Sequence, residues 1–459
     1  MKQREAGPWA KLGRGWVALA VMGTLWLTAL VLWGVERFPP PDFESGYTFP
    51  ATTAPPPRAE IMQYVDVAVL LAALSLAAYF VLKLRSRKHV FWLTVFSVLY
   101  FGFYRKGCVC SVGSTQDVAL AIFNSHYAVP WSVLAFFLLP LVFALFFGRV
   151  FCAAVCPLGA IQELVVVKPK TLPPWVEHAL SVIPFIYLGA GVLFAATGSA
   201  FLFCQYDPFI SLYRRSGAFA MVALGGVFLL LGTILGRPYC RFLCPYGALL
   251  SLCSRFSRHN VTLLPEDCVH CQLCDVACPY GAIREPTGLL PAPDPKKLRL
   301  RQVGLGVLAL LLVIVGGWLG RQLAVPFSKM NATVALAEQV AAEATGRAHQ
   351  MTDASKAFHD TGKPVEELYA QAQQIRGRFA TGTMIWGAFA GLVLGLKLFS
   401  LSQFDRRRCS FEPDAAQCVA CARCYTHCPN EQARIKREQR AKTIPLSAAP
   451  VGTSLSKNA

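Results

Sequence analysis

Long apolar segments constrain the fold of this chain more than any other feature. A membrane-spanning helix takes about 20 apolar residues. Eight segments approach this length, at roughly 15–34, 64–83, 90–104, 131–147, 179–203, 217–235, 303–320 and 383–402. The chain is 54% hydrophobic and only 15% charged, whereas a soluble domain carries about 25% charged residues. The sequence therefore predicts an all-α polytopic membrane protein with about eight transmembrane helices, of which the short one at 90–104 is tilted or partly re-entrant.

The distribution of positive charge predicts how these spans are oriented. The formal net charge is +18, but no basic stripe with interleaved aromatic residues, as nucleic-acid binding requires, lies outside the span flanks. The basic clusters at 83–89, 296–301 and 405–409 all adjoin the same side of the predicted spans. Cytoplasmic loops are enriched in Lys and Arg, so both termini are expected in the cytoplasm of a bacterium and the spans in its inner membrane. The first segment has no small-residue cleavage site, which predicts a retained anchor rather than a signal peptide.

Two cysteine motifs with the same spacing carry the clearest chemistry. Residues 268–279 (CVHCQLCDVACP) and 418–429 (CVACARCYTHCP) share the pattern C-x-x-C-x-x-C-x-x-x-C-P. This is the spacing of bacterial ferredoxins, in which the fourth cysteine of each run binds the other 4Fe-4S cluster. Structural zinc is the alternative, but it usually takes paired C-x-x-C units. The predicted ligands are Cys268, Cys271, Cys274 and Cys428 for one cluster, and Cys418, Cys421, Cys424 and Cys278 for the other.

One membrane excursion separates the two ferredoxin halves. Residues 303–320 lead out of the cytoplasm and residues 383–402 return to it. Both halves therefore face the cytoplasm and form one split ferredoxin module of the bacterial two-cluster type. The outer segment 321–382 is expected to form two helices that break near DTGKPVEEL (360–368) and to dock a partner.

A second pair of motifs is an internal duplication. Residues 148–164 (GRVFCAAVCPLGAIQEL) and 236–252 (GRPYCRFLCPYGALLSL) share G-R-x-x-C-x-x-x-C-P-x-G-A, and each follows an apolar span. Two hairpins packed about a pseudo-twofold axis would bring four thiols together at the inner membrane edge, which is enough for one further Fe–S cluster or metal. The alternative is that these cysteines are small buried residues and the prolines end helices. The predicted inner site comprises Cys152, Cys156, Cys240 and Cys244.

A degraded third copy of the motif predicts a site at the outer face. In GCVCSVGSTQDV (107–118), Cys110, Gly113 and Gln116 align with Cys156, Gly159 and Gln162. The next outer turn, FCQYDPF, carries one cysteine, so positions 110, 156, 204 and 244 alternate between the two faces. The candidate outer ligands are Cys108, Cys110 and Cys204, with Asp207 or His126 as a fourth. Arg105 and Lys106 are expected to lower the pKa of the neighbouring thiols. A disulfide or unreactive thiols are the alternative in an oxidising compartment.

The remaining features organise the chain without adding a catalytic centre. No general base, nucleophile or phosphate-binding loop is recognisable, which indicates an electron-transfer component of an oxidoreductase system rather than a self-contained enzyme. Cys253 and Cys409 have no partner at ligand spacing. The predicted units are two N-terminal spans (1–89), a four-span core (90–259), the first ferredoxin half (260–302), the outer excursion with its two spans (303–402), the second ferredoxin half (403–440) and a disordered tail (441–459).

The paired GRxxCxxxCPxGA elements followed by CxxCxxCxxxCP resemble the NosR/NapH family of membrane-bound polyferredoxins over roughly 90–430. The resemblance implies that electrons pass between cytoplasmic 4Fe-4S clusters and a periplasmic redox protein or flavoprotein in anaerobic respiration, such as a nitrous oxide or nitrate reductase. The donor would be cytoplasmic or quinone-linked. The chain lacks the flavin domain of NosR, so no flavin is expected on it. Two other functions fit the same motifs: a membrane copper reductase or metalloenzyme assembly factor, and an iron–sulfur redox sensor.

Overall fold

The structure is a computed structural model that describes residues 61–107, 109–124, 127–167, 169–170, 172–263, 268–286, 295–347, 350–402 and 410–443. Several sequence predictions fall outside these ranges. They concern the first span at 15–34, the residues Cys108, His126 and Cys409, and the tail beyond Thr443. The tail was expected from residue 441, but the last helix continues to Thr443.

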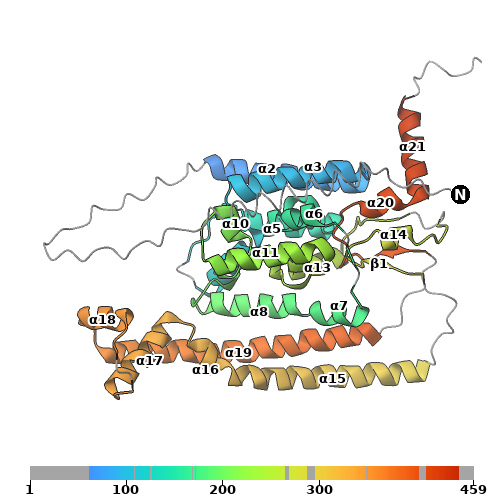
Figure 1. The fold of residues 1–459 in the computed structure, drawn as a ribbon. Helices are drawn as coiled ribbons and strands as arrows, with labels where there is room; N and C mark the ends of the chain where they lie inside the picture. Colours follow the sequence, from blue (N-terminus) through green and yellow to red (C-terminus); the bar gives the residue numbers. More distant parts are fainter. Residues whose placement is uncertain are drawn as a thin grey trace, which may run out of the picture.

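Apolar helices that run along a common direction form the body of the protein (Figure 1). They are α2 (Ile61–Ala78), α3 (Arg87–Ser97), α5 (Trp131–Phe147), α8 (Ile183–Ala196), α11 (Phe219–Ile234), α15 (Pro295–Gln322) and α19 (Val365–Ser402). Helices α2 and α3 continue into π-helical turns, η1 (Tyr79–Lys83) and η2 (Val98–Tyr104). The ferredoxin elements lie at one end of this bundle, which we call the ferredoxin end, and helices α16–α18 lie at the opposite end.

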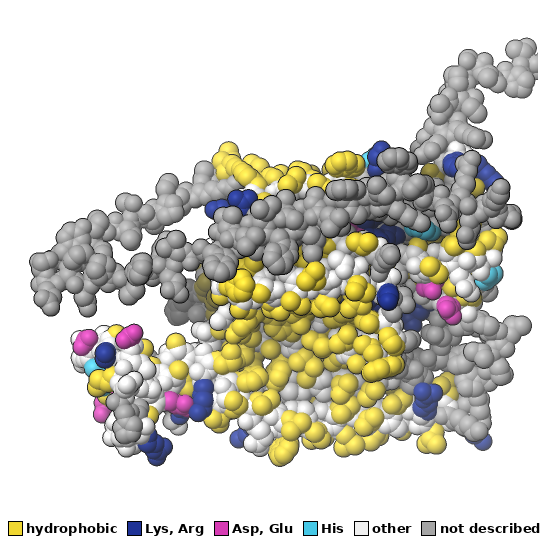
Figure 2. All heavy atoms as spheres, in the orientation of Figure 1, with side chains coloured by type: hydrophobic (Ala, Val, Ile, Leu, Met, Phe, Trp, Pro, Cys, Tyr) yellow, Lys and Arg dark blue, Asp and Glu magenta, His cyan; other side chains and the backbone are white. Residues whose placement is uncertain are grey.

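Four of the predicted spans form helices that are long and apolar enough to cross a membrane. These are Ile61–Lys83, Trp175–Ala196, Leu298–Gln322 and Val365–Ser400. Helices α5 and α11 are apolar but shorter, and the predicted span 90–104 lies within α3 and η2. Apolar side chains cover the middle of the bundle in Figure 2, whereas charged side chains gather toward its two ends. This pattern is what a lipid-facing surface requires.

Short helices begin directly at the cysteine motifs. They include α4 (Ser111–Phe123), η3 (Phe151–Val155), α6 (Pro157–Val165), α12 (Pro238–Phe242) and α13 (Pro245–Arg255), and three others, α7 (Pro174–Leu180), α9 (Leu202–Gln205) and α10 (Ile210–Arg214), connect the hairpins. The sulfur of Cys244 caps α13 by accepting the backbone N–H of Gly247 at 3.4 Å. Pro245 then occupies the first helical position, where a missing N–H costs nothing. The C-P dipeptide of the motif therefore marks a helix start.

Helices α15 and α19 pack closely along a seam of glycines. A Cβ on Gly316 would lie 2.3 Å from the carbonyl oxygen of Gly387, and one on Gly391 would lie 2.0 Å from that of Leu312. Small residues at such spacing let two helix backbones approach each other in a membrane. This hairpin is the excursion that separates the ferredoxin halves in the sequence.

The outer segment is more finely divided than the two helices expected. It comprises α16 (Ala324–Ser328), α17 (Ala332–Ala344), α18 (Asp353–Asp360) and the beginning of α19. The break falls at 361–364, as expected, but α19 then runs without interruption into the span. Five residues from α17 and α19 form a small separate core, Val334, Ala337, Val340, Leu368 and Ala372.

The two ferredoxin halves meet in a short two-stranded sheet, which is a small exception to the all-α prediction. Strand β1 (Ile283–Arg284) pairs antiparallel with β2 (Glu412–Pro413). Helix α14 (Leu273–Val276) belongs to the first half, and α20 (Arg423–His427) and α21 (Pro429–Thr443) belong to the second. The backbone is left-handed at matching positions of the two motifs, His270 and Gln272 in one and Ala420 and Ala422 in the other. The halves therefore share one local fold.

Candidate iron-sulfur sites

Two cavities of the ferredoxin module are each lined by four cysteines. The linings match the two ligand sets predicted from the spacing: Cys268, Cys271, Cys274 and Cys428 around one cavity, and Cys278, Cys418, Cys421 and Cys424 around the other. In each cavity the fourth cysteine comes from the opposite half of the module. Four thiols around one cavity fit a 4Fe-4S cluster. Within the described part of the chain, no three Cys, His, Asp or Glu side chains converge as ligands of a single metal ion would.

The four cysteines of the duplicated motif also lie together, and we call them the inner quartet (Cys152, Cys156, Cys240 and Cys244). Cys240 is half-buried and the other three are buried. Burial raises the pKa of Cys156 well above its ordinary value, and the three neighbouring thiols raise it further. Thiolates so close to one another need compensating positive charge, such as that of bound iron. A Cβ on Gly159 would lie 3.4 Å from the backbone oxygen of Cys152 and 3.6 Å from the sulfur of Cys240, so cysteines of both copies of the motif lie beside the same glycine.

The two copies of the motif pack against each other reciprocally. A Cβ on Gly159 of the first copy would lie 3.3 Å from Nη1 of Arg237 in the second copy. A Cβ on Gly247 of the second copy would lie 3.5 Å from Nη2 of Arg149 in the first. Each motif glycine therefore makes room for the arginine of the other repeat. This explains why the motif keeps both residue types, a role that the sequence pattern alone did not assign.

Polar side chains of the motif also contact the sulfurs. Gln162 Nε2 lies 3.2 Å from the sulfur of Cys240, and Arg149 Nη2 lies 3.8 Å from that of Cys152. Hydrogen bonds from donors to ligand sulfur are one of the means by which a protein sets the reduction potential of a cluster.

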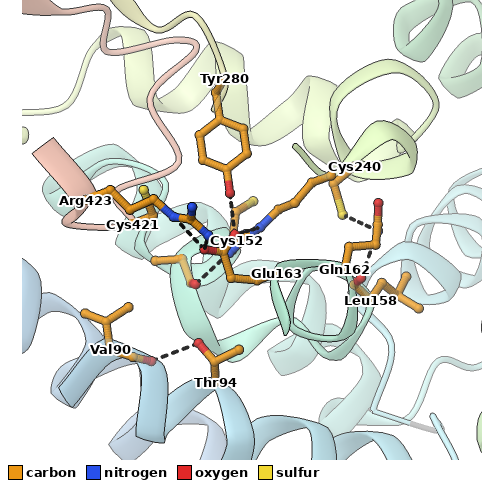
Figure 3. A network of polar contacts seen from close by, with 12 residues as sticks. Val90, Thr94, Cys152, Leu158, Gln162, Glu163, Cys240, Tyr280, Cys421 and Arg423 are labelled. Carbon is orange, nitrogen blue, oxygen red and sulfur yellow. Dashed lines mark hydrogen bonds and ion pairs between the residues drawn. The ribbon is translucent and has the colours of Figure 1, made fainter. Parts of the chain in front are cut away.

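Next to the inner quartet, one buried carboxylate binds three arginines (Figure 3). Glu163 is completely buried and pairs with Arg237 at 2.9 Å, with Arg423 at 2.7 Å and also with Arg87. The hydroxyl of Tyr280 donates a further hydrogen bond to it. Burial alone would raise the pKa of Glu163, but the three guanidinium groups hold it well below its usual range. The cluster therefore carries two positive charges in excess, in a region of low dielectric constant.

This arginine cluster connects the inner quartet to the ferredoxin module. Arg237 donates to the backbone carbonyls of Cys152 and Ala153, while Arg87 donates to the carbonyl of Cys421 at 3.0 Å. Arg423 is itself part of the second ferredoxin motif. The excess positive charge of the arginine cluster lies between sites that would hold negatively charged, thiolate-bound iron–sulfur clusters, and it would offset their charge.

Further contacts attach the second ferredoxin half to the helices of the bundle. Arg149 Nη1 donates to the carbonyl of Ala416 at 3.2 Å. Arg85, in the turn between α2 and α3, pairs with buried Glu431 and lies over the ring of Tyr425 at 5.0 Å. The sequence signalled the arginines of the duplicated motif only as part of a repeat. It gave no signal for Arg85, which is one of several basic residues at the end of a span.

The two described cysteines of the predicted outer site are Cys110 and Cys204. Both are free thiols, Cys110 half-buried and Cys204 exposed. Helix α10, which follows Cys204, lies toward the end of the bundle opposite the ferredoxin module (Figure 1). The expectation that Arg105 lowers the thiol pKa is wrong, because Arg105 pairs with Asp66 at 2.6 Å. Burial and then Asp207 raise the pKa of Cys110 to about 12.

Comparison with known proteins finds two family models that match segments containing the cysteine motifs. A family model described as a 4Fe-4S binding domain matches residues 129–173 and again residues 217–263. These two matches contain the two copies of the duplicated motif. A second model with the same description matches residues 261–284, which contain the first ferredoxin motif. No solved structure matches the chain.

Relatives of named types share parts of this chain. An uncharacterized protein of Methanocaldococcus jannaschii, MJ0750, is 29% identical over 39% of this chain and 77% of its own length. The putative electron transport protein YccM of Escherichia coli K12 is 25% identical over 30% of this chain and 43% of its own. The regulatory protein NosR of Stutzerimonas stutzeri is 30% identical over 41% of this chain and 28% of its own. The chain thus spans less than half the length of YccM and of NosR. Together, the 4Fe-4S matches, the ferredoxin-type cysteine runs and these relatives support iron–sulfur electron transfer as the chemistry of the chain and its similarity to membrane polyferredoxins of the NosR/NapH type.

Proposed function

We propose that this protein carries electrons across the bacterial inner membrane between its cytoplasmic ferredoxin module and a periplasmic redox partner. The observation that carries the proposal is the Glu163 cluster, which contacts the backbone of both Cys152 and Cys421. The inner quartet and a ferredoxin cavity are therefore joined through one ion-pair cluster, in which the side chains of Glu163 and Arg237 are buried. This contact supports a path in which the two sets of cysteines exchange electrons.

The residues that would hold the redox groups are the two ferredoxin sets and the inner quartet. When bound, 4Fe-4S clusters supply one-electron carriers, and four thiolates hold each of them. A hydrocarbon core of about 30 Å is too thick for one transfer step, so carriers are needed at more than one depth. The buried arginines beside Glu163 offset the negative charge of thiolate-bound clusters and fix the ferredoxin module against the membrane helices.

The orientation and the partner follow from the charge distribution and the relatives. The ferredoxin end carries the basic clusters 83–89 and 296–301, which the positive-inside rule places in the cytoplasm. The opposite end carries α17 and α18, whose packing on α19 supports a docking role for this hairpin. The name of the relative YccM refers to electron transport, and the NosR/NapH resemblance favours a respiratory reductase of the nitrous oxide or nitrate type as the acceptor.

Two measurements on anaerobically purified protein test the proposal. Iron and acid-labile sulfide should exceed about eight per chain, the content of the two ferredoxin sites alone. In vesicles, the protein should pass electrons from a reductant on the ferredoxin side to an impermeant dye on the other side. Cys240→Ser should stop this transfer while the ferredoxin clusters still reduce. Cys253→Ser is the matched control, because Cys253 belongs neither to the inner quartet nor to either ferredoxin set. Transfer at the wild-type rate in Cys240→Ser would refute the proposal.

A second candidate is reduction of a metal ion such as copper at the opposite end, for the assembly of a metalloenzyme. The exposed thiol of Cys204 favours it, since an incoming ion can reach that sulfur. Here the ion is a substrate, so Cys204→Ser would abolish copper reduction by vesicles but leave transfer to the dye intact.

A further inference from the structure

The segment around Cys204 repeats the architecture of the inner quartet. Gln116 Oε1 accepts the backbone N–H of Phe203 at 2.9 Å, as Gln162 Oε1 accepts that of Tyr239 at 3.1 Å. In each case the accepted N–H directly precedes a cysteine, Cys204 or Cys240.

The glycine that follows each helix start gives the same correspondence. A Cβ on Gly113 would lie 3.1 Å from the sulfur of Cys204, and one on Gly159 would lie 3.6 Å from that of Cys240. Cys204 therefore corresponds to Cys240. The alternation of positions along the chain had instead aligned Cys204 with Cys244. Cys240 and Cys244 are only about one helical turn apart, and regular spacing along the chain does not distinguish them.

With this register, Asp207 occupies the place of Cys244. The outer turn reads C-x-x-D-P and the inner one C-x-x-x-C-P, so an aspartate precedes the proline where the inner copy has a cysteine. Asp207 Oδ1 accepts the backbone N–H groups of Phe209 and Ile210 at 2.9 and 3.3 Å. Cys244 Sγ likewise accepts a backbone N–H of the helix that follows it.

Two buried polar atoms at this place have no hydrogen-bond partner among the described residues. One is Oδ2 of Asp207, whose side chain is 2% exposed, and the other is Nε2 of Gln116, which is fully buried. In the inner copy, the equivalent amide nitrogen of Gln162 lies 3.2 Å from the sulfur of Cys240. An unpaired buried polar group is costly and calls for an explanation, of which an absent ion or ligand is one.

We propose that Cys110, Cys204 and Asp207 ligate a second iron–sulfur cluster within the membrane domain, at the opposite end from the ferredoxin module. Oδ2 of Asp207 takes the place that the thiolate of Cys244 has in the inner quartet, and Gln116 Nε2 donates to a sulfur of the site. The proposal rests on the proposed function, for which it supplies the terminal carrier. A carboxylate ligand favours iron over Cu(I), which selects soft sulfur ligands.

Buried aromatic residues lie between the two sites. Phe209 lies two residues beyond Asp207, and Tyr239 directly precedes Cys240. The ring of Tyr239 packs against that of Phe209 with centroids 5.5 Å apart. The inner quartet and the proposed site are therefore neighbours through one packed core rather than isolated at two surfaces.

The test compares Asp207→Asn with Asp207→Cys in full-length protein purified anaerobically from ⁵⁷Fe-labelled cells. Asp207→Asn keeps the oxygen that accepts the two backbone N–H groups but removes the free charged oxygen. It should lose the iron and sulfide of one cluster, about four irons if the cluster is of the 4Fe-4S type. Asp207→Cys should keep the wild-type content and lose one Mössbauer component, that of the oxygen-ligated iron. Asp117→Asn is the matched control, since Asp117 lies near Cys204 and accepts a hydrogen bond from Tyr127 at 3.0 Å.

Wild-type iron content and spectra in Asp207→Asn would overturn the inference, and so would free alkylation of Cys110 and Cys204 in the native anaerobic protein. Cys240→Ser separates this inference from the proposed function. If Cys240→Ser loses iron and transfer but Asp207→Asn loses neither, the inference fails and the proposed function stands. If Asp207→Asn loses iron but Cys240→Ser still conducts, the outer cluster stands and the proposed function fails.

Discussion

Glu163 and Arg423 are 260 positions apart in the chain, yet their side chains pair at 2.7 Å, with the carboxylate fully buried. Glu163 belongs to the first copy of the duplicated motif, and Arg423 lies within the second ferredoxin motif. The pair therefore fixes the position of a ferredoxin cavity relative to the inner quartet. Electron transfer is sensitive to such positions, because the productive geometry must be held by surrounding residues.

Glu163→Gln should destabilise this junction strongly. The amide cannot balance three buried guanidinium groups, and breaking a buried ion pair costs about 3–5 kcal/mol. We expect a lower thermal unfolding midpoint and release of the cluster bound by Cys418, Cys421 and Cys424. The loss of cluster absorbance on heating measures this release. Glu338→Gln is the control, since Glu338 pairs with Arg376 at 3.0 Å in the hairpin of α17 and α19, at the opposite end of the bundle. Equal midpoints for the two variants would show that the Glu163 cluster does not hold the module in place.

Cys428→Ser should damage the cluster of the first ferredoxin half rather than its own. Its side chain lines the cavity formed by Cys268, Cys271 and Cys274, and loss of one ligand of four weakens a cluster. Conversely, Cys278→Ser should affect the cluster held by the second half. Electron paramagnetic resonance of the reduced variants distinguishes the two signals. Loss of the second-half signal in Cys428→Ser would contradict cross-ligation.

Arg149→Gln should lower the reduction potential of the inner site. Its guanidinium lies 3.8 Å from the sulfur of Cys152, and a nearby positive charge stabilises the more negative, reduced state. Two charges about 4 Å apart in a protein interact by a few kcal/mol, so for a one-electron carrier the shift should be on the order of 100 mV. Redox titration of the variant measures it. Arg149→Lys keeps the charge and should shift the potential less, so an equal shift in both variants would assign the effect to packing.

Gly387→Leu should disrupt the seam between α15 and α19. A Cβ at this position would lie 2.1 Å from the carbonyl oxygen of Gly316, and overpacking of a tight contact costs about 1–3 kcal/mol. We expect a lower yield of folded protein in detergent and a lower unfolding midpoint. Gly304→Leu is the control, because a Cβ there meets nothing within 4 Å. Similar loss in both variants would mean that leucine at any glycine of this hairpin is harmful.

Local patterns in the sequence predicted the long apolar helices and the cysteines that line the two ferredoxin cavities. The apolar length of a span is set by the thickness of the bilayer and can be read from a short window of residues. The spans 64–83 and 303–320 therefore appear as helices close to their predicted bounds. The spacing of a ferredoxin motif is fixed by the cluster that its loop must wrap. The two cysteine sets read from that spacing line two separate cavities.

The boundaries of the longer elements were less predictable. The span expected at 383–402 is the end of a helix that begins at Val365, because helix propensity continues through the polar residues before the apolar ones. Hydropathy identifies where lipid contact starts and not where the helix starts.

The sequence by itself determined which residues are apolar, which are duplicated and which have ligand spacing, since these properties depend only on order along the chain. Tertiary structure alone decided which residues meet. It placed Glu163 among three arginines from three distant segments, and it matched Cys204 with Cys240 and Asp207 with Cys244. The physical reason is that a buried charge is stable only when opposite charges surround it, and the packing of the whole chain decides which side chains those are.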